Sequence, residues 1–239
     1  MTTSDLPPPN GASVVRTSSG EQAALYVRRL IFDGHLVPGV RIPQEEIART
    51  LGISRIPLRE ALFALEREGW VTLEMHRGAS VNTFDERAVR DHYELIGVIY
   101  GFTLKQALTR SGEEYVERLA EIADEIRNEP DPVAVAAHLM KFHAAMVAGA
   151  QSTRIKAVLR GMTAIVPGDF FANIPGAVDI ERNAIETIMA AVRRGDGDAA
   201  ASEYERMMRV LGGLVVEVLR DRGLFEPAGA SGVGDVAAG

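Results

Sequence analysis

Two arginines four residues apart, Arg55 and Arg59, follow a glycine-containing turn in the stretch LGISRIPLREAL. Side chains at this spacing lie on the same face of an α-helix. Such a pair of guanidinium groups can bind guanine bidentately in the major groove of DNA. Alternatively, two arginines at this spacing belong to an ordinary solvated helix face. The elements around the pair decide between the two interpretations.

The arginine pair lies at the start of the third of three predicted helices. Apolar residues at helical spacing predict the first helix over 21–34 and the second over 44–52. Gly52 allows a sharp turn, because a residue without Cβ adopts positive φ at little cost. Ser54 is a suitable N-cap, and Pro57 is tolerated in the first helical turn. The apolar face of the third helix predicts these core residues: Leu58, Ala61, Leu62 and Leu65.

Two β-prone runs, WVTLEM and ASVNTF, follow the third helix and are joined by His76, Arg77 and Gly78. They predict a hairpin. Helix, helix, turn, helix and hairpin is the plan of a winged helix-turn-helix, in which the N-terminal residues of the third helix read the major groove. This context favours DNA recognition by Arg55 and Arg59. Arg77, at the hairpin tip, is expected to reach phosphate or the minor groove.

The rest of the chain predicts a second, all-helical domain. Residues 20–84 hold eight arginines and eight acidic residues, whereas the remainder holds 18 basic and 25 acidic residues. From Asp85 onward the pattern is mostly α, with helices expected at 85–110, 112–128, 131–149, 152–166, 178–194 and 197–222. We therefore expect a DNA-binding domain at 20–84 and a helical domain at 85–225. Disordered tails are expected at 1–19 and 226–239, which are rich in Pro, Gly, Ser and Ala.

The run from Pro38 to Val81 resembles the DNA-binding domain of the GntR family of transcription factors. The resemblance rests on Pro38-Gly39, on the block from Ser54 to Leu62, on Leu65 with Glu68-Gly69, and on Arg77-Gly78. The helical part is similar to the effector domain of the fatty-acid-regulator-like subfamily, called FCD. Its marks are Lys141-Phe142-His143 and Ile188, Ala191, Val192, Gly195 and Asp196 before a last long helix.

The resemblance implies a dimeric regulator whose operator binding is controlled by a small molecule. Ile56 stands where family members commonly have Thr, and it can contact a thymine methyl or pack against the wing; we prefer the thymine contact. The expected DNA-binding residues are Ser54, Arg55, Ile56, Pro57, Arg59, His76, Arg77 and Gly78.

The resemblance also places a divalent metal in the helical domain, bound by one Asp and three His. At those positions this chain has Leu139, His143, Ile185 and Met207. One histidine does not hold a transition metal without help, so we expect no metal cofactor. His138 is expected to face solvent. A ligand from Asp91, His92 or Glu94 remains an alternative.

Two further positions that are often polar in the family are Ile96 and Tyr100 here. These replacements favour an apolar effector whose polar end is bound by His143, Tyr100 and Asn183. The expected effector-binding residues are Ile96, Tyr100, Leu139, His143, Asn183, Ile185 and Met207. The alternatives are a cavity filled by side chains, or a metal-dependent regulator sensing a small carboxylate.

The expected protein is a cytoplasmic homodimeric repressor of a pseudo-palindromic operator, with no membrane partner. A secretory signal and a transmembrane run are not found in the sequence. Cysteine is absent, which excludes disulfides, thiolate metal sites and cysteine nucleophiles. An α-helical enzyme is the alternative of a different class. Phosphate-cradling glycine loops, HExxH and nucleophile-elbow patterns are absent, which disfavours it.

Overall fold

The computed structural model describes residues 18–74, 77–162, 172 and 174–225. The chain forms two compact units. The first comprises the residues up to Glu86 together with those from Leu219 onward, and the second is Arg87–Val218. No helix within the described residues combines the length and apolarity needed to cross a membrane.

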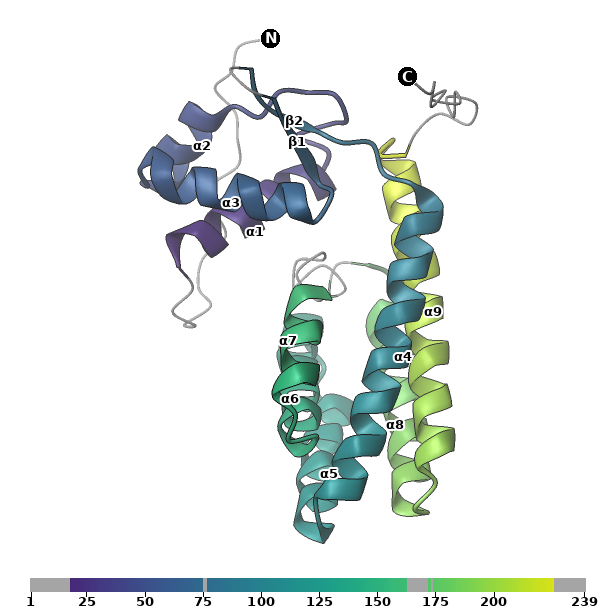
Figure 1. Ribbon diagram of the computed structural model, residues 1–239. Helices are drawn as coiled ribbons and strands as arrows, with labels where there is room; N and C mark the ends of the chain where they lie inside the picture. Colours follow the sequence, from purple (N-terminus) through teal and green to yellow (C-terminus); the bar gives the residue numbers. More distant parts are fainter. Residues whose placement is uncertain (1–17, 75–76, 163–171, 173, 226–239) are drawn as a thin grey trace, which may run out of the picture. The chain divides into compact units, whose positions relative to one another are not determined.

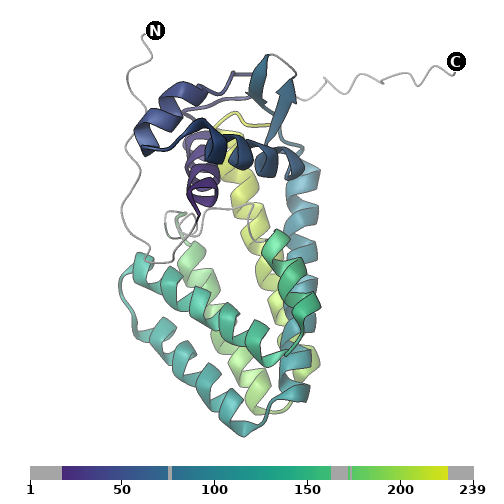
Figure 2. The same cartoon turned by 60° about the vertical axis from the view of Figure 1, so that its left-hand side comes forward.

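The first unit is built from three helices and a hairpin (Figure 2). The hairpin strands are antiparallel, with Val71 opposite Val81. The chain before the second helix extends this sheet, because the backbone N–H of Ile42 donates to the carbonyl of Ala79 at 2.8 Å. The elements are α1 (Ser19–Phe32), α2 (Gln44–Leu51), α3 (Arg55–Arg67), β1 (Val71–Glu74) and β2 (Gly78–Val81).

Helix α1 begins at Ser19, the last residue of the expected N-terminal tail. Ser18 and Glu21 form a capping box: the Ser18 hydroxyl accepts from the Glu21 backbone N–H, and the Glu21 carboxylate accepts from the Ser18 backbone N–H. A Ser-x-x-Glu sequence before an apolar run is a helix start signal. This capping box fixes the start of α1 at the end of the expected tail.

The core of the first unit lies between α1, α3 and the hairpin. The four α3 residues expected inside, Leu58, Ala61, Leu62 and Leu65, are all buried. Trp70 is buried at the end of α3, with its ring 5.1 Å from that of Phe32 and 4.8 Å from that of Phe84. This core fixes the direction of α3 and of the strands that follow it.

The end of the last helix, α9 (Gly197–Asp221), also belongs to the first unit. The Phe84 backbone N–H donates to the carbonyl of Leu224 at 3.1 Å, and the Leu224 side chain is fully buried. The Arg222 guanidinium donates to the Phe32 carbonyl. Residues 219–225 were expected in the helical domain; they belong to the first unit because they pack there.

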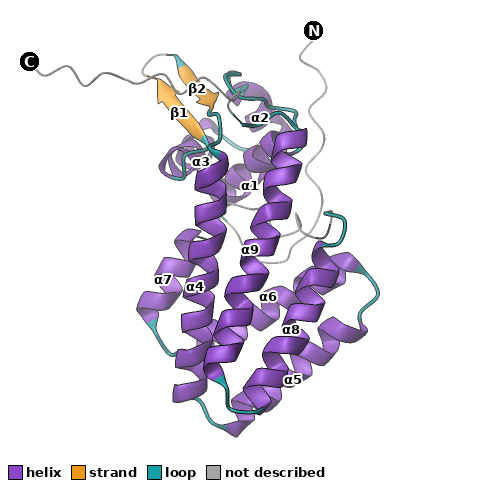
Figure 3. Ribbon diagram, turned by 90° about the vertical axis from the view of Figure 1, so that its right-hand side faces the viewer, coloured by secondary structure: helices purple, strands orange, loops and turns teal. Residues whose placement is uncertain are grey.

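The second unit is a bundle of long helices (Figure 3). Helix α5 packs on α6 and α8. The helices expected from the sequence agree with those of the structure within about two residues. The predicted helix at 152–166 is described only as far as Met162. The bundle consists of α4 (Glu86–Arg110), α5 (Glu113–Asn128), α6 (Pro132–Gly149), α7 (Thr153–Met162), α8 (Ala177–Arg193) and most of α9.

Helices α4 and α9 run side by side (Figures 1 and 3). Small residues allow this close approach. A Cβ on Gly101 would lie 3.1 Å from the Ala201 side chain, and one on Gly212 would lie 2.6 Å from the Tyr93 Cβ. One face of α4 therefore packs against α9.

Candidate DNA-binding and effector sites

The turn between α2 and α3 positions the candidate DNA-reading residues. Gly52 ends α2 in the left-handed conformation, with φ of 64°. The Ile53 backbone N–H then donates back to the Ala48 carbonyl at 3.0 Å. Ser54 has extended backbone as the N-cap residue, although its side chain makes no capping hydrogen bond. Pro57 lies in the first turn of α3, where its missing N–H costs no helical hydrogen bond.

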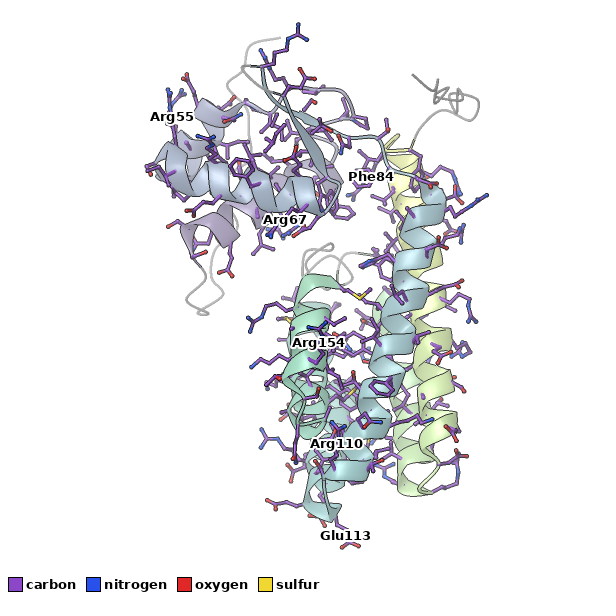
Figure 4. All side chains as sticks on the ribbon, in the orientation of Figure 1. Arg55, Arg67, Phe84, Arg110, Glu113 and Arg154 are labelled. Atoms are coloured by element: carbon purple, nitrogen blue, oxygen red, sulfur yellow. The ribbon has the colours of Figure 1, made fainter. Side chains whose placement is uncertain are left out.

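Three side chains at the start of α3 face solvent. Arg55, labelled in Figure 4, is exposed and forms an ion pair with Glu45 at 2.6 Å. Arg59 is exposed, with its guanidinium carbon 5.4 Å from the Phe63 ring centroid. Ile56 is 72% exposed, so it does not pack against the wing in this structure. These contacts are weak at exposed sites, and DNA can replace them.

The hairpin supplies the second part of the candidate DNA surface. Arg77 is exposed, 3.9 Å from the Glu74 carboxylate. Gly78 follows it with φ of 93°, a conformation that favours glycine. His76, also expected at this tip, lies outside the described residues.

The bundle contains a buried polar group built on several helices. The Tyr100 ring from α4 stacks on the His143 ring from α6, with centroids 4.6 Å apart. Tyr204 from α9 lies against both, with its ring centroid 5.3 Å from that of Tyr100 and 6.0 Å from that of His143. Burial and the nearby Tyr100 and Glu181 raise the pKa of Tyr204. We refer to Tyr100, His143, Glu181 and Tyr204 as the polar cluster.

Burial sets the charge of the polar cluster. It lowers the pKa of His143 to about 4, so the imidazole is neutral at pH 7. It raises the pKa of Glu181, from α8, to about 8, so this carboxyl is mostly protonated at pH 7. Removing a charged group from water favours its neutral form. The cluster therefore presents neutral donors and acceptors.

Both units match known families. Residues 19–81 match the family of bacterial regulatory proteins called the gntR family, and residues 91–210 match the FCD domain. The chain belongs to the GntR family and carries an FCD domain. GntR proteins of this kind are DNA-binding transcriptional regulators, which sets the enzyme alternative aside.

Relatives of this GntR regulator match it over different shares of its length. The uncharacterised HTH-type transcriptional regulator Rv0043c of Mycobacterium tuberculosis is 28% identical over 211 residues, 88% of this chain and 86% of that protein. The fatty acid metabolism regulator protein of Shewanella halifaxensis is 32% identical over 117 residues, 48% of each protein.

Solved structures share the fold. The E. coli protein McbR/YncC gives a TM-score of 0.61 at 16% identity, covering 84% of this chain and 98% of that one. A GntR regulator from Rhodococcus sp. RHA1 gives 0.56 at 22% identity, covering 84% of this chain and 99% of that one. The expected winged helix-turn-helix followed by a helical bundle is confirmed.

The structure brings most of the predicted effector residues of the GntR regulator into the bundle core. Five of the seven residues are buried. His143 is partly exposed as a residue, although its Nε2 atom is buried. Asn183 is exposed on α8 and lies apart from this group, so the structure does not support its expected role. The buried members are Ile96, Tyr100, Leu139, Ile185 and Met207.

Tyr204 and Glu181 were missed by sequence reasoning. Each lies near a predicted position on the same helix: Tyr204 precedes Met207 by three residues, and Glu181 precedes Ile185 by four. Residues at these spacings share a helix face. A search for polar residues one turn away from each predicted apolar position would have found both.

The described residues contain no group of three or more His, Asp or Glu side chains that could hold a metal ion. His138, expected to face solvent, instead lies mostly covered against α5. Its Nδ1 is 2.8 Å from the Glu125 carboxylate, and its Nε2 is 3.8 Å from that of Glu129. The expectation was wrong because α5 packs on this face of α6 with its acidic residues.

Proposed function

We propose that this regulator represses transcription as a homodimer bound to a pseudo-palindromic operator, and that an apolar effector in the bundle controls its affinity for DNA. The observation that carries the DNA part is the exposure of Arg55, Ile56 and Arg59 together at the start of α3. In winged helices this part of the third helix reads base edges. The two arginines read guanine, and Ile56 contacts a thymine methyl. The protein acts where the DNA is, in the cytoplasm.

Replacing Arg59 with alanine is expected to weaken specific operator binding by about 1–3 kcal/mol. Binding to random DNA should fall less, because a base contact contributes to discrimination rather than to the general phosphate attraction. Titration of both DNAs at one salt concentration measures the difference. Arg67→Ala, at the other end of α3 (Figure 4), is the matched control. Unchanged discrimination in Arg59→Ala would refute its role in reading bases.

The dimer part of the proposal rests on an exposed apolar face of α4. Leu95, Val98 and Phe102 are 52%, 50% and 52% exposed. Their spacing places them on one helix face, away from the glycines that pack on α9. Contiguous exposed apolar side chains mark interaction surfaces. A second copy related by a two-fold axis would cover this face, and a two-fold dimer requires a nearly palindromic operator.

Replacing Phe102 with glutamate is expected to produce monomers and to weaken binding to a two-half-site operator more than tenfold. Binding to a single half-site should change little, because α3 is untouched. Sedimentation and operator titration measure the two effects. Met140→Glu is the matched control, because Met140 is a 60% exposed apolar residue on α6. A Phe102→Glu protein that stays dimeric would exclude this face.

We further propose that the regulator works without a metal cofactor, since only His143 occupies one of the expected ligand positions. Adding zinc or nickel should leave the melting temperature nearly unchanged. Calorimetry with metal concentrations up to the micromolar range tests this. A saturable rise in melting temperature would support the alternative, a metal-dependent sensor of a small carboxylate.

An effector can release DNA only by binding the competent and incompetent states with different affinity. Helix α9 carries Tyr204 in the bundle, and it ends in residues that pack in the first unit. Leu224 and Phe84 join this end to the chain that enters α4. We propose that a shift of α9 on effector binding is transmitted through these residues.

A further inference from the structure

Two buried polar atoms of the polar cluster have no hydrogen-bond partner among the described residues. They are Nε2 of His143 and the hydroxyl of Tyr204. Tyr204 is completely inaccessible to solvent. Buried polar groups are nearly always hydrogen-bonded, to protein or to ordered water. Two unpaired atoms in one cluster therefore indicate that a partner belongs there.

The geometry favours one partner for both atoms. The His143 and Tyr204 ring centroids are 6.0 Å apart, and Tyr100 lies against both rings. A single hydroxyl, carbonyl or amide group can contact both at such a separation. Leu139 and Met207, one helical turn from His143 and Tyr204 on the same helices, are apolar and buried. A molecule with one such group and an otherwise apolar surface matches these surroundings.

The charge of the cluster disfavours an anionic partner on physical grounds. The residues that act electrostatically on Tyr204 are Tyr100, Glu181 and Tyr115, none of which is a cation. Burial lowers the pKa of His143, so the imidazole carries no positive charge at pH 7. A carboxylate or phosphate placed here would lose its hydration without gaining a positive partner, which costs several kcal/mol.

A groove between α5 and α6 shares Tyr115 with the surroundings of Tyr204. Its volume is about 830 Å³, and Tyr115, Ile122, Lys141 and Ala145 are among its lining residues. The Tyr115 hydroxyl is itself buried without a partner in the described part of the chain. Its ring presses against Gly149, where an added Cβ would lie 2.4 Å from the ring. Tyr115 thus lines the groove and also lies near Tyr204.

We propose that His143 and Tyr204 bind the uncharged hydroxyl, carbonyl or amide group of a mainly apolar effector that enters through the α5–α6 groove. This rests on the proposed function, in which the bundle takes an effector. It narrows the ligand class to neutral molecules and assigns polar recognition to Tyr204 and His143. Tyr115 forms the inner wall of the entrance.

Three probes of equal chain length test the ligand class: octan-1-ol, octanamide and octanoate. Each is titrated into the full-length protein at neutral pH and followed by calorimetry and melting temperature. The two uncharged probes are expected to bind saturably, and octanoate is expected to bind at least tenfold more weakly. Tighter binding of octanoate would overturn the proposal, and so would a lack of saturable binding by both uncharged probes.

The variant Tyr204→Phe tests the recognition residue. It removes an unpaired buried hydroxyl, so the melting temperature of the probe-free protein should be unchanged or higher. Binding of the uncharged probes should weaken about tenfold, which corresponds to one lost hydrogen bond of about 1.4 kcal/mol. If Tyr204 had only a structural role, Tyr204→Phe would lower the melting temperature and leave the binding of the uncharged probes unchanged. Tyr26→Phe, a buried tyrosine of the first unit, is the control.

Operator titration separates failure of this inference from failure of the proposed function. If the uncharged probes bind in a Tyr204-dependent way but leave operator affinity unchanged, the site stands and effector control fails. If operator affinity responds to the probes equally in wild type and Tyr204→Phe, effector control stands and this site is wrong. If ordered water is the partner of His143 and Tyr204, none of the probes will displace it and bind saturably. That result would refute the inference.

Discussion

Replacing Glu68 with alanine is expected to lower the free energy of unfolding of the first unit by about 3–5 kcal/mol. Glu68 accepts hydrogen bonds from Arg28 of α1, at 2.5 Å and 3.1 Å from the two guanidinium nitrogens. The two side chains are only 5% and 18% exposed. Removing the carboxylate leaves a buried guanidinium without its partner, and the desolvation of that charge is then uncompensated.

Trp70 provides the measurement, because it is the single tryptophan and lies two residues from Glu68 in the first unit. Denaturant unfolding followed by its fluorescence reports this unit. The double variant Arg28→Met with Glu68→Leu should recover most of the lost stability, because apolar residues of similar volume replace a buried pair well. The exposed pair of Arg55 and Glu45 is the comparison: Glu45→Ala should cost less than about 1 kcal/mol. A loss of less than about 1 kcal/mol in Glu68→Ala would contradict the prediction.

Raising the pH from 5.5 to 7.5 is expected to destabilise the second unit through Glu181 by about 2–3 kcal/mol. The pKa of Glu181 is raised by burial from 4.5 to about 8 in the folded protein. Between these two pH values the folded state holds one proton more than the unfolded state. The free energy of unfolding therefore falls with rising pH in this window, and the effect ends once the pH passes the folded pKa.

The variant Glu181→Gln isolates this contribution, because its amide does not titrate. The unfolding free energy of wild type minus that of Glu181→Gln should fall steadily from pH 5.5 to pH 7.5. Other groups, such as His143 with its lowered pKa, largely cancel in the difference. Denaturant unfolding followed by far-UV circular dichroism supplies both curves. A difference that does not change with pH would show that Glu181 is ionised or solvated in the folded protein.

The DNA-reading end of α3 was predictable because its determinants are local. Gly52 sets the turn, Ser54 occupies the N-cap position with extended backbone, and the 3.6-residue period places Leu58 and Leu62 inward. Arg55 and Arg59 must then point outward. The same local rules predicted the helices of the bundle closely.

Pairings between distant segments were not predictable in this way. The contact of Arg28 with Glu68 joins residues 40 apart in sequence. His138 lies against Glu125 because α6 packs on α5. Neither sequence stretch signals its partner, since many helix pairings satisfy the same apolar periodicity.

The amino-acid sequence by itself determined the order of the elements, the exposed arginines of α3 and the apolar replacement of the expected metal ligands. Only the tertiary structure decided that Tyr204 and Glu181 join His143 in the bundle, and that residues 219–225 complete the first unit. The physical reason is that helical periodicity fixes which face of a segment is buried. The neighbour that covers this face is chosen by the packing of all segments together.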